Sequence, residues 1–212
     1  MVLDYLSACS AMLPVAAAVP AFKHGDASIK TLALFFLLVV AVEATALGFA
    51  LRGRSNMAIY NYYLLIETPF WLLLLRTWCK LKIVRAMFVA MAIAYVFAWL
   101  LNHIAWGGIG EPSNALGVAR AVILTFAAGT VLLEISQLVG QNLFANPRFW
   151  IASGVLIFFS VNAAMFSLWS FILRPAVGEV ANIWFLHSVL NILANTLYTI
   201  GLLCISRKTI SS

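Results

Sequence analysis

Long runs of apolar residues, each followed by a short polar break, dominate the pattern of this 212-residue chain. A helix needs roughly 20 mainly apolar residues to cross the hydrocarbon core of a bilayer. Seven segments meet that requirement, at about 3–22, 28–51, 57–79, 82–105, 114–138, 149–172 and 182–205. The pattern therefore predicts an all-α fold, a bundle of seven transmembrane helices that forms a single domain over residues 1–212.

The breaks between the segments have the composition of loops. They are "KHGDAS", "RGRSN", "CKLK", "WGGIGEPSN", "GQNLFANPR" and "RPAVGEVAN". Gly, Pro, Asn and charged residues of this kind interrupt helices. All six breaks are short, so none leaves room for a soluble domain. We therefore expect the function to reside in the bundle.

Composition adds that the surface must face lipid. Hydrophobic residues make up 64% of the chain and charged residues only 9%, with a mean hydropathy of +1.02. A soluble domain carries about a quarter charged residues, so the expected partner is the lipid bilayer. The formal net charge is +6. Its basic residues follow the ends of the apolar segments, a placement that favours headgroup anchoring over nucleic-acid binding.

The distribution of basic residues predicts an orientation. The breaks after the first, third and fifth segments, together with the C-terminus, carry Lys23, Lys30, Arg76, Lys80, Lys82, Arg85, Arg148, Arg207 and Lys208. The opposite side carries Arg52, Arg54 and Arg174. Cytoplasmic loops are enriched in Lys and Arg, so we expect the N-terminus outside and the C-terminus in the cytoplasm. The first charged residue is Asp4. A signal peptide has a positive start, so we expect a retained first helix.

Two carboxylates lie near the centres of predicted spans. Glu67 is in "YNYYLLIETPFW", where Tyr63 precedes it by one helical turn, and Glu43 is in "VVAVEATALG" of the preceding span. A charge at the bilayer centre costs about 3 kcal/mol or more, so such residues face the bundle and have partners. At 1.5 Å per residue the two carboxylates lie within about one turn in depth. A ligand or proton site and a hydrogen-bonded structural role are both open for Glu67. Pro69, two residues later, is a candidate kink.

The last span and the fifth supply further polar candidates. His187, Asn191 and Asn195 recur at four-residue intervals, so they share one helix face. They predict either a polar lining or interhelical hydrogen bonds. Arg120 lies two turns inside the fifth span. We expect its side chain to extend to the headgroups, with pairing to a buried carboxylate as the alternative. Asn162 in the sixth span is expected to point elsewhere.

Several known chemistries lack their motifs. The last span has no lysine for a retinal Schiff base, and the chain has no glycine-rich phosphate loop and no HExxH. Cys9, Cys79 and Cys204 have neither metal-site nor disulfide spacing. A zinc site would need Glu43, Glu67 and one histidine, an unspecific set. We therefore expect no cofactor and no resident metal.

Three stretches resemble a known group of proteins. "YNYYLLIE", "PRFWIASGVLIFFSVN" and "LHSVLNILANTLYTIGLL" are similar to segments of small seven-span bacterial membrane proteins of the Bacteroidota type. Similar segments also form the membrane sensor parts of signalling proteins. The resemblance covers about a third of the chain and implies that Glu67 and the polar face of the last span belong to a shared pattern. It implies location in the bacterial inner membrane and carries no established activity.

The resulting hypothesis is a receptor-like sensory module. It would bind a small or lipidic ligand, or a proton, in the outer half of the bundle, at Glu43, Glu67, Tyr63, Arg120, His187, Asn191 and Asn195. A basic rim of Arg76, Lys80, Lys82 and Arg85 would meet a cytoplasmic signalling partner or anionic lipid. A small-solute or proton-coupled transporter, an intramembrane metal-dependent hydrolase and an assembly subunit remain alternatives. An enzyme is the less favoured class.

Overall fold

The computed structural model describes residues 2–105, 109, 114–137, 142–172 and 177–210. Within these ranges every regular element is a helix. The elements are α1 (Val2–Ser10), α2 (Met12–His24), α3 (Ala27–Leu51), α4 (Met57–Trp78), α5 (Lys82–Ala105), α6 (Asn114–Ser136), η1 (Leu143–Ala145), α7 (Pro147–Ile172) and α8 (Val177–Ile210). The prediction of an all-helical chain is confirmed for the described residues.

Within the described part of the chain, seven stretches are long and apolar enough to cross a membrane, as the sequence predicts. They are Tyr5–Phe22, Ala27–Leu51, Met57–Trp78, Lys82–Ala105, Ala115–Ser136, Pro147–Ser167 and Phe185–Ile205. The first of them is divided, because α1 ends at Ser10 and α2 begins at Met12. Pro14 has no N–H for the carbonyl of Ser10, and its ring crowds that carbonyl, which interrupts the helix one turn before the proline. By contrast, α4 runs without a break through Pro69.

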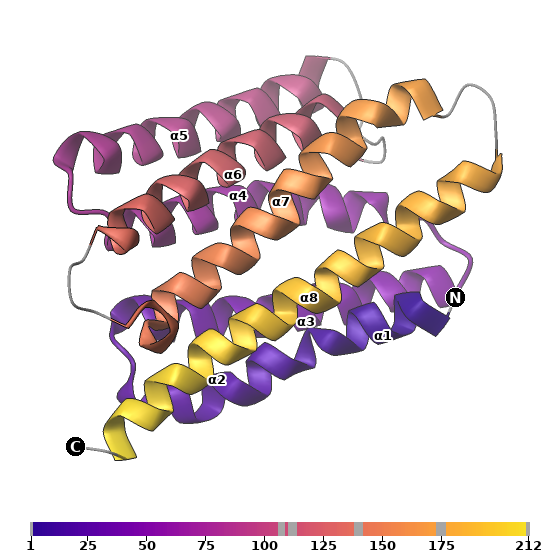
Figure 1. Cartoon of the computed structure of the whole chain (residues 1–212). Coiled ribbons are helices and arrows are strands. Elements are labelled where there is room, and N and C mark those ends of the chain that lie inside the picture. Colours follow the sequence, from indigo (N-terminus) through magenta and orange to yellow (C-terminus); the bar gives the residue numbers. More distant parts are fainter. Residues whose placement is uncertain (1, 106–108, 110–113, 138–141, 173–176, 211–212) are drawn as a thin grey trace.

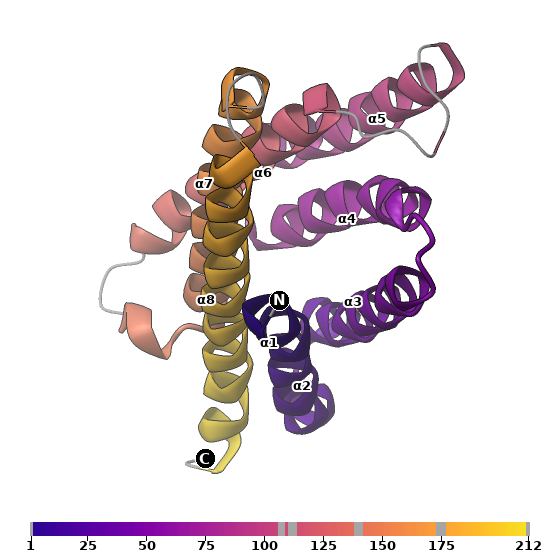
Figure 2. The ribbon, with the colours of Figure 1, turned by 90° about the vertical axis from the view of Figure 1, so that its right-hand side faces the viewer.

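The helices form a ring in chain order (Figures 1 and 2). Each of α3 to α8 packs against its neighbours in sequence, and α8 closes the ring by packing against α1 and α2. Contacts between α4 and α6 add a brace across the ring. The N- and C-termini lie at opposite ends of the bundle (Figure 1). We call the end with the C-terminus and the α2–α3, α4–α5 and α6–α7 connections the basic end.

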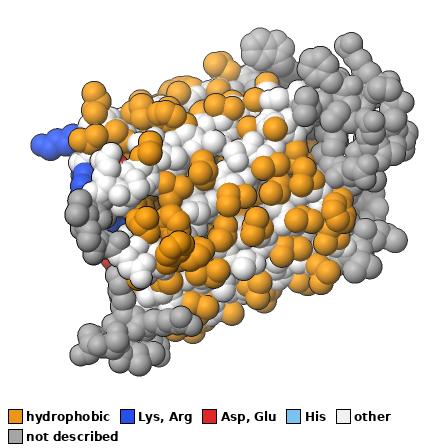
Figure 3. Space-filling model, in the orientation of Figure 1, with side chains coloured by type: hydrophobic (Ala, Val, Ile, Leu, Met, Phe, Trp, Pro, Cys, Tyr) orange, Lys and Arg blue, Asp and Glu red, His pale blue; other side chains and the backbone are white. Residues whose placement is uncertain are grey.

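The outer surface of the bundle is apolar. Large hydrophobic side chains are exposed on its flanks, for example Leu34 at 58%, Phe97 at 61% and Leu133 at 66%. Figure 3 shows hydrophobic side chains spread over one flank, with Lys and Arg side chains gathered at the basic end. An exposed apolar patch this extensive is unusual in a soluble monomer, and it is the surface that lipid tails would solvate.

Aromatic side chains fill the centre of the ring. The Phe35 ring of α3 stacks on Phe70 of α4 with centroids 3.8 Å apart, and it meets Trp71 edge-on at 5.7 Å. Tyr198 of α8 contacts Phe36 at 5.4 Å and Trp71 at 5.5 Å. Each such pair adds stabilisation of about 0.5–1.5 kcal/mol beyond its buried area. This cluster joins α3, α4 and α8 across the interior and supports the polar groups of α4.

At the basic end, Asp26 links three elements. It is the N-cap of α3, where its carboxylate accepts hydrogen bonds from the Ile29 N–H (3.0 Å) and the Ser28 hydroxyl (2.6 Å). Its other oxygen pairs with the guanidinium of Arg148 on α7 at 3.1 Å. The Ser28 hydroxyl also accepts from the Trp78 indole of α4 at 3.1 Å. Asp26 therefore ties the start of α3 to the adjacent ends of α4 and α7.

This arrangement predicts a dependence of stability on pH. Burial alone would raise the pKa of Asp26, but the hydrogen bonds from Ser28 and Ile29 and the Arg148 cation hold that pKa below its usual range. The contribution is therefore complete at neutral pH and disappears as the pH falls through the folded-state pKa, below about 4. We expect Asp26→Ala to lower the unfolding free energy by about 1 kcal/mol at pH 7 and to have a smaller effect at pH 3.

Thermal unfolding in detergent at pH 7 and pH 3 measures this difference. Asp26→Asn is the matched control, because asparagine keeps the N-cap hydrogen bond and removes only the charge. An Asp26→Ala defect of equal size at both pH values would contradict the assigned role of the carboxylate.

Candidate functional site

The buried face of α4 is the centre of the polar interior. Asn61, Glu67 and Thr68 of α4 are each less than 7% exposed. The Asn61 amide donates to the carbonyl of Ile109 at 2.6 Å, and the Asn61 main-chain carbonyl accepts from the Trp99 indole of α5 at 3.0 Å. These bonds fix the rotation of α4 against α5. They hold the carboxylate of Glu67, which lies less than two turns further along, toward α6.

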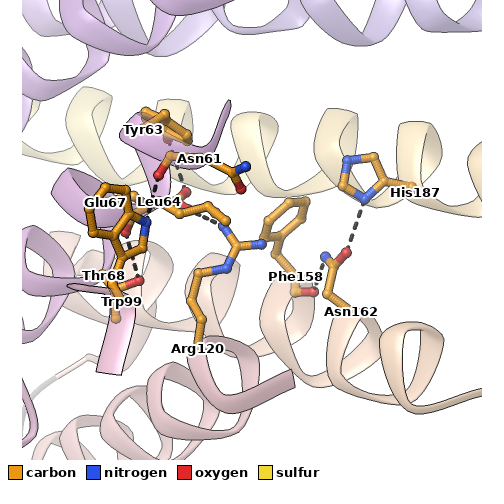
Figure 4. A network of polar contacts seen from close by, with 10 residues as sticks. All are labelled: Asn61, Tyr63, Leu64, Glu67, Thr68, Trp99, Arg120, Phe158, Asn162 and His187. Carbon is orange, nitrogen blue, oxygen red and sulfur yellow. Dashed lines mark hydrogen bonds and ion pairs between the residues drawn. The ribbon is translucent and has the colours of Figure 1, made fainter. Parts of the chain in front are cut away.

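Glu67 and Arg120 form a buried ion pair between α4 and α6 (Figure 4). One Glu67 oxygen, Oε2, accepts from Nη1 of Arg120, and the other, Oε1, accepts from the Tyr63 hydroxyl at 2.9 Å. Both charged side chains are only 8% exposed. Both also lie in helices that are long and apolar enough to cross a membrane, and in a bilayer a lone charge would be costly and would require a partner. The sequence candidates Glu67, Tyr63 and Arg120 thus share one network.

The expectation that Arg120 extends to the headgroups is wrong. The residue is 7% exposed, and its side chain points into the bundle toward α4 (Figure 4). The reason is that the interior offers two partners for the cation. Glu67 supplies an opposite charge, and the Phe159 ring of α7 lies under the guanidinium with its centroid 5.2 Å from Cζ. A cation over an aromatic face gains up to about 2 kcal/mol when it is desolvated.

The guanidinium retains unused hydrogen-bonding capacity. Nε of Arg120 is buried and makes no hydrogen bond. A guanidinium has five N–H donors in a planar fork. Burial of an unpaired donor is unfavourable by about 1–3 kcal/mol, more for a charged group. Arg120 is therefore a strong donor in an apolar setting, with its Nε–H uncommitted.

Glu43 lies outside this network. It is half-buried on α3, and its Oε2 accepts from the Tyr60 hydroxyl of α4 at 3.3 Å. Tyr60 precedes Tyr63 by one turn, so α4 gives each of the two carboxylates its own tyrosine donor. Glu43 and Glu67 therefore bind tyrosines that lie one turn apart on the same helix. The hydrogen bonds of the two carboxylates thus go to different partners.

His187 of α8 pairs with Asn162 of α7, a pairing that the sequence did not predict. The Asn162 amide nitrogen donates to the Phe158 carbonyl at 2.7 Å, so its oxygen faces His187 Nδ1 at 3.0 Å (Figure 4). That oxygen is an acceptor, which places a proton on Nδ1. Asn162 lies two residues after Ser160 and therefore on the opposite side of α7, the side that meets His187 of α8. Asn162 is 1% exposed.

Asn191 and Asn195 bind the first helix. Nδ2 of Asn191 donates to the Ser7 hydroxyl at 2.9 Å, and Nδ2 of Asn195 donates to the Ser10 hydroxyl at 2.8 Å. Ser10 in turn donates to the Ser7 carbonyl at 2.6 Å. Both serines are 7% exposed. These two asparagines therefore form an α1–α8 seam, and the interhelical hydrogen-bonding alternative describes them. The three-residue spacing of Ser7 and Ser10 was the available sequence signal.

The seam predicts modest, local effects. We expect Asn191→Ala and Asn195→Ala each to lower the unfolding free energy by about 0.5–1.5 kcal/mol, since interhelical hydrogen bonds in membranes are of this size. Protease accessibility of the N-terminal segment should rise in both variants, because α1 loses its partner. Thermal unfolding and limited proteolysis measure the two effects. Thr196→Val, which removes an exposed hydroxyl bonded only within α8, is the control and should change neither.

At the basic end, Glu134 of α6 contacts the rim. Its Oε2 accepts from the backbone N–H of Lys80 at 2.6 Å and so fixes the α4–α5 connection. Burial, with the nearby Glu134 charge, raises the pKa of Cys79 to about 11, so this buried residue is a neutral thiol at physiological pH. Lys80, Lys82 and Arg85 are exposed around it, and Arg76 is half-buried. The rim predicted from the sequence is therefore one contiguous stretch at this connection.

Comparisons of the chain with protein-family models, curated proteins and solved structures find no match. The resemblance to small seven-span bacterial proteins therefore stays a prediction. Among the residues that the structure describes, no group of three or more His, Cys, Asp or Glu side chains is arranged to hold a metal ion. Glu43, Glu67 and His187, the set that a zinc hydrolase would need, have separate partners.

Proposed function

We propose that the protein is a receptor-like seven-helix membrane module whose responsive element is the buried Glu67–Arg120 ion pair. The observation that supports this most is the pair itself, which joins α4 to α6 across the ring inside a membrane-spanning region. A hydrophobic contact would brace the two helices without a charge. Intramembrane ionisable residues mark ligand, ion or proton sites by default.

The network can report a binding event. A ligand or proton that changes the charge on Glu67 or Arg120 weakens their attraction, and that attraction holds α4 to α6. The Arg120 cation also lies over Phe159 of α7, which adjoins Phe158 beside His187. A change at the ion pair therefore reaches α4, α6, α7 and α8. Two arrangements of these helices with different ligand affinities are sufficient for signalling.

The basic rim is the proposed output side. Arg76 lies in the last turn of α4, the helix that carries Glu67, and Lys80, Lys82 and Arg85 follow the end of that helix. Clusters of this kind bind anionic lipid or an acidic partner surface. In the orientation expected from the positive-inside pattern, this end faces the cytoplasm, and the protein is a multi-pass protein of the bacterial inner membrane.

Native mass spectrometry of the purified protein, released from detergent, tests the proposal. Wild type is compared with Glu67→Gln and with Thr45→Val, a control that removes an exposed hydroxyl bonded within α3. The expected result is a retained small molecule or lipid in wild type and in the control, with altered occupancy in Glu67→Gln. Identical bare polypeptide in all three would contradict a binding site at the ion pair.

Reconstitution separates a receptor from a transporter. A receptor binds its ligand without moving it across the bilayer, whereas a transporter with the same site produces net flux. The bound molecule identified by mass spectrometry is loaded outside proteoliposomes, and its accumulation is followed over time. Accumulation that depends on Glu67 would replace the receptor assignment with a proton-coupled carrier.

A further inference from the structure

The charge balance around Arg120 restricts the ligands that the proposed site accepts. In the free protein the Glu67 carboxylate neutralises the Arg120 cation, and Glu43 adds one more carboxylate nearby. A second anion at Arg120 would leave excess negative charge inside a membrane-spanning region, which is strongly unfavourable. A second cation would compete with Arg120 for Glu67. A ligand is therefore accommodated only if its binding leaves the total charge unchanged.

The uncommitted Nε–H of the guanidinium specifies the ligand group. Glu67 occupies Nη1, while Nε is buried without a partner in a side chain that is only 8% exposed. Nε and Nη2 form one side of the guanidinium fork, the side that matches the two oxygens of a carboxylate. The Phe159 ring under the cation favours an apolar chain beyond that carboxylate.

We propose that the site binds a lipid-soluble monocarboxylic acid as a carboxylate and a proton, an inference that rests on the proposed function. The ligand carboxylate docks on the Nε edge of Arg120, and Glu67 takes up the proton. One R–COOH enters the site and gives up its proton to the Glu67 carboxylate. The products are one R–COO⁻ on Arg120 and one neutral Glu67 carboxyl group. Arg120 then holds two carboxyl groups that share a single negative charge. No net charge enters the membrane, and the attraction that holds α4 to α6 decreases.

Titratable groups from several helices surround Glu67, and Arg120 carries the positive charge among them. The neighbours are Tyr63 on α4, Glu43 on α3, Tyr95 on α5, Arg120 on α6 and Tyr198 on α8. The tyrosines are neutral at physiological pH. Glu43 opposes any additional anion and so reinforces the need for the proton. Glu67 is the acceptor nearest to Arg120, which makes it the group whose charge the ligand exchanges.

The experiment measures equilibrium binding of radiolabelled decanoate to the full-length protein in phosphatidylcholine nanodiscs between pH 6 and 8. Empty nanodiscs give the background, and decanol is the uncharged competitor. Because one proton is taken up per anion bound, we expect the dissociation constant of wild type to rise about tenfold for each pH unit. Glu67→Gln mimics the protonated carboxyl group. It should bind independently of pH and, at pH 8, about tenfold or more tightly than wild type.

Arg120→Gln should lose saturable binding at every pH. Binding by wild type that does not vary with pH, displacement by decanol as effective as by decanoate, or weaker binding by Glu67→Gln would each overturn the inference. If Glu67→Gln does not fold, calorimetry of wild type in two buffers of different ionisation enthalpy counts the protons directly. One proton taken up per decanoate supports the inference, and none overturns it.

The two proposals fail in different ways. If mass spectrometry finds a retained ligand that decanoate does not displace, the receptor site stands and the acid class is wrong. If neither decanoate nor a retained ligand binds, both are wrong.

Discussion

Removal of either charged side chain of the Glu67–Arg120 ion pair will lower the free energy of unfolding by about 3–5 kcal/mol. Glu67→Ala leaves the Arg120 cation buried with only Phe159 beneath it, and Arg120→Ala leaves the Glu67 carboxylate with only the Tyr63 hydroxyl. An uncompensated buried charge accounts for a loss of this size. Reversible SDS titration in bicelles, followed by tryptophan fluorescence, measures the unfolding free energy of both variants.

Removing both charges together should restore most of that loss. The combination Glu67→Leu, Arg120→Met and Tyr63→Phe replaces the ion pair and its third hydrogen-bonding group by apolar side chains of similar volume. Replacement of a buried ion pair in this way is often neutral or stabilising. We therefore expect this triple variant to lie within about 1.5 kcal/mol of wild type. A triple variant as unstable as either single variant would contradict the view that an unpaired charge causes the defect.

The triple variant also separates stability from function. Interiors without a charge fold readily, so a stable triple variant that no longer retains ligand would show that the ion pair is kept for binding. Equal ligand retention in wild type and the triple variant would assign the pair a structural role alone. This distinction matters because a buried ion pair is by itself weak evidence for a stabilising role.

The spans were predictable because the bilayer imposes one simple requirement. Each span needs about 20 apolar residues, and hydropathy along the chain reports that length directly. The predicted and observed limits agree to within a few residues in most spans, for example 82–105 against Lys82–Ala105. Hydropathy does not report the interruption of the first span at Ala11. The sequence indicates it through Pro14, which lacks the N–H that a continuous helix needs.

Side-chain partners were less predictable because depth along a helix does not define rotation about it. Arg120 lies at a depth from which a long side chain reaches either the headgroups or the interior. Only the packing of α4 against α6 places Glu67 within its reach. Asn162 and His187 likewise share a bond because α7 and α8 cross at that level. The residue types were thus recognisable from the sequence, but their pairing depends on helix rotation.

Close packing of α7 on α8 gives the second large expected effect. An added Cβ at Gly201 would lie 2.8 Å from Ile151 Cγ1 and 2.9 Å from the Pro147 carbonyl oxygen. At Gly154 it would lie 2.6 Å from the Tyr198 ring. That ring is 6% exposed and is held between Phe36 and Trp71, so it has little room to move. Small residues at such positions allow helices to approach closely in membranes.

We expect Gly201→Ala and Gly154→Ala each to lower the unfolding free energy by about 1–3 kcal/mol, the usual cost of overpacking. Gly201→Ala should be the more severe, because a backbone carbonyl cannot rotate away as a side chain can. Gly48→Ala is the matched control, since nothing lies within 4 Å of its added Cβ. Alanine there should be neutral or stabilising by up to about 1 kcal/mol through helix propensity. SDS titration of the three variants measures these differences. An equal change at all three glycines would show that propensity, and not the approach of α7 to α8, determines the result.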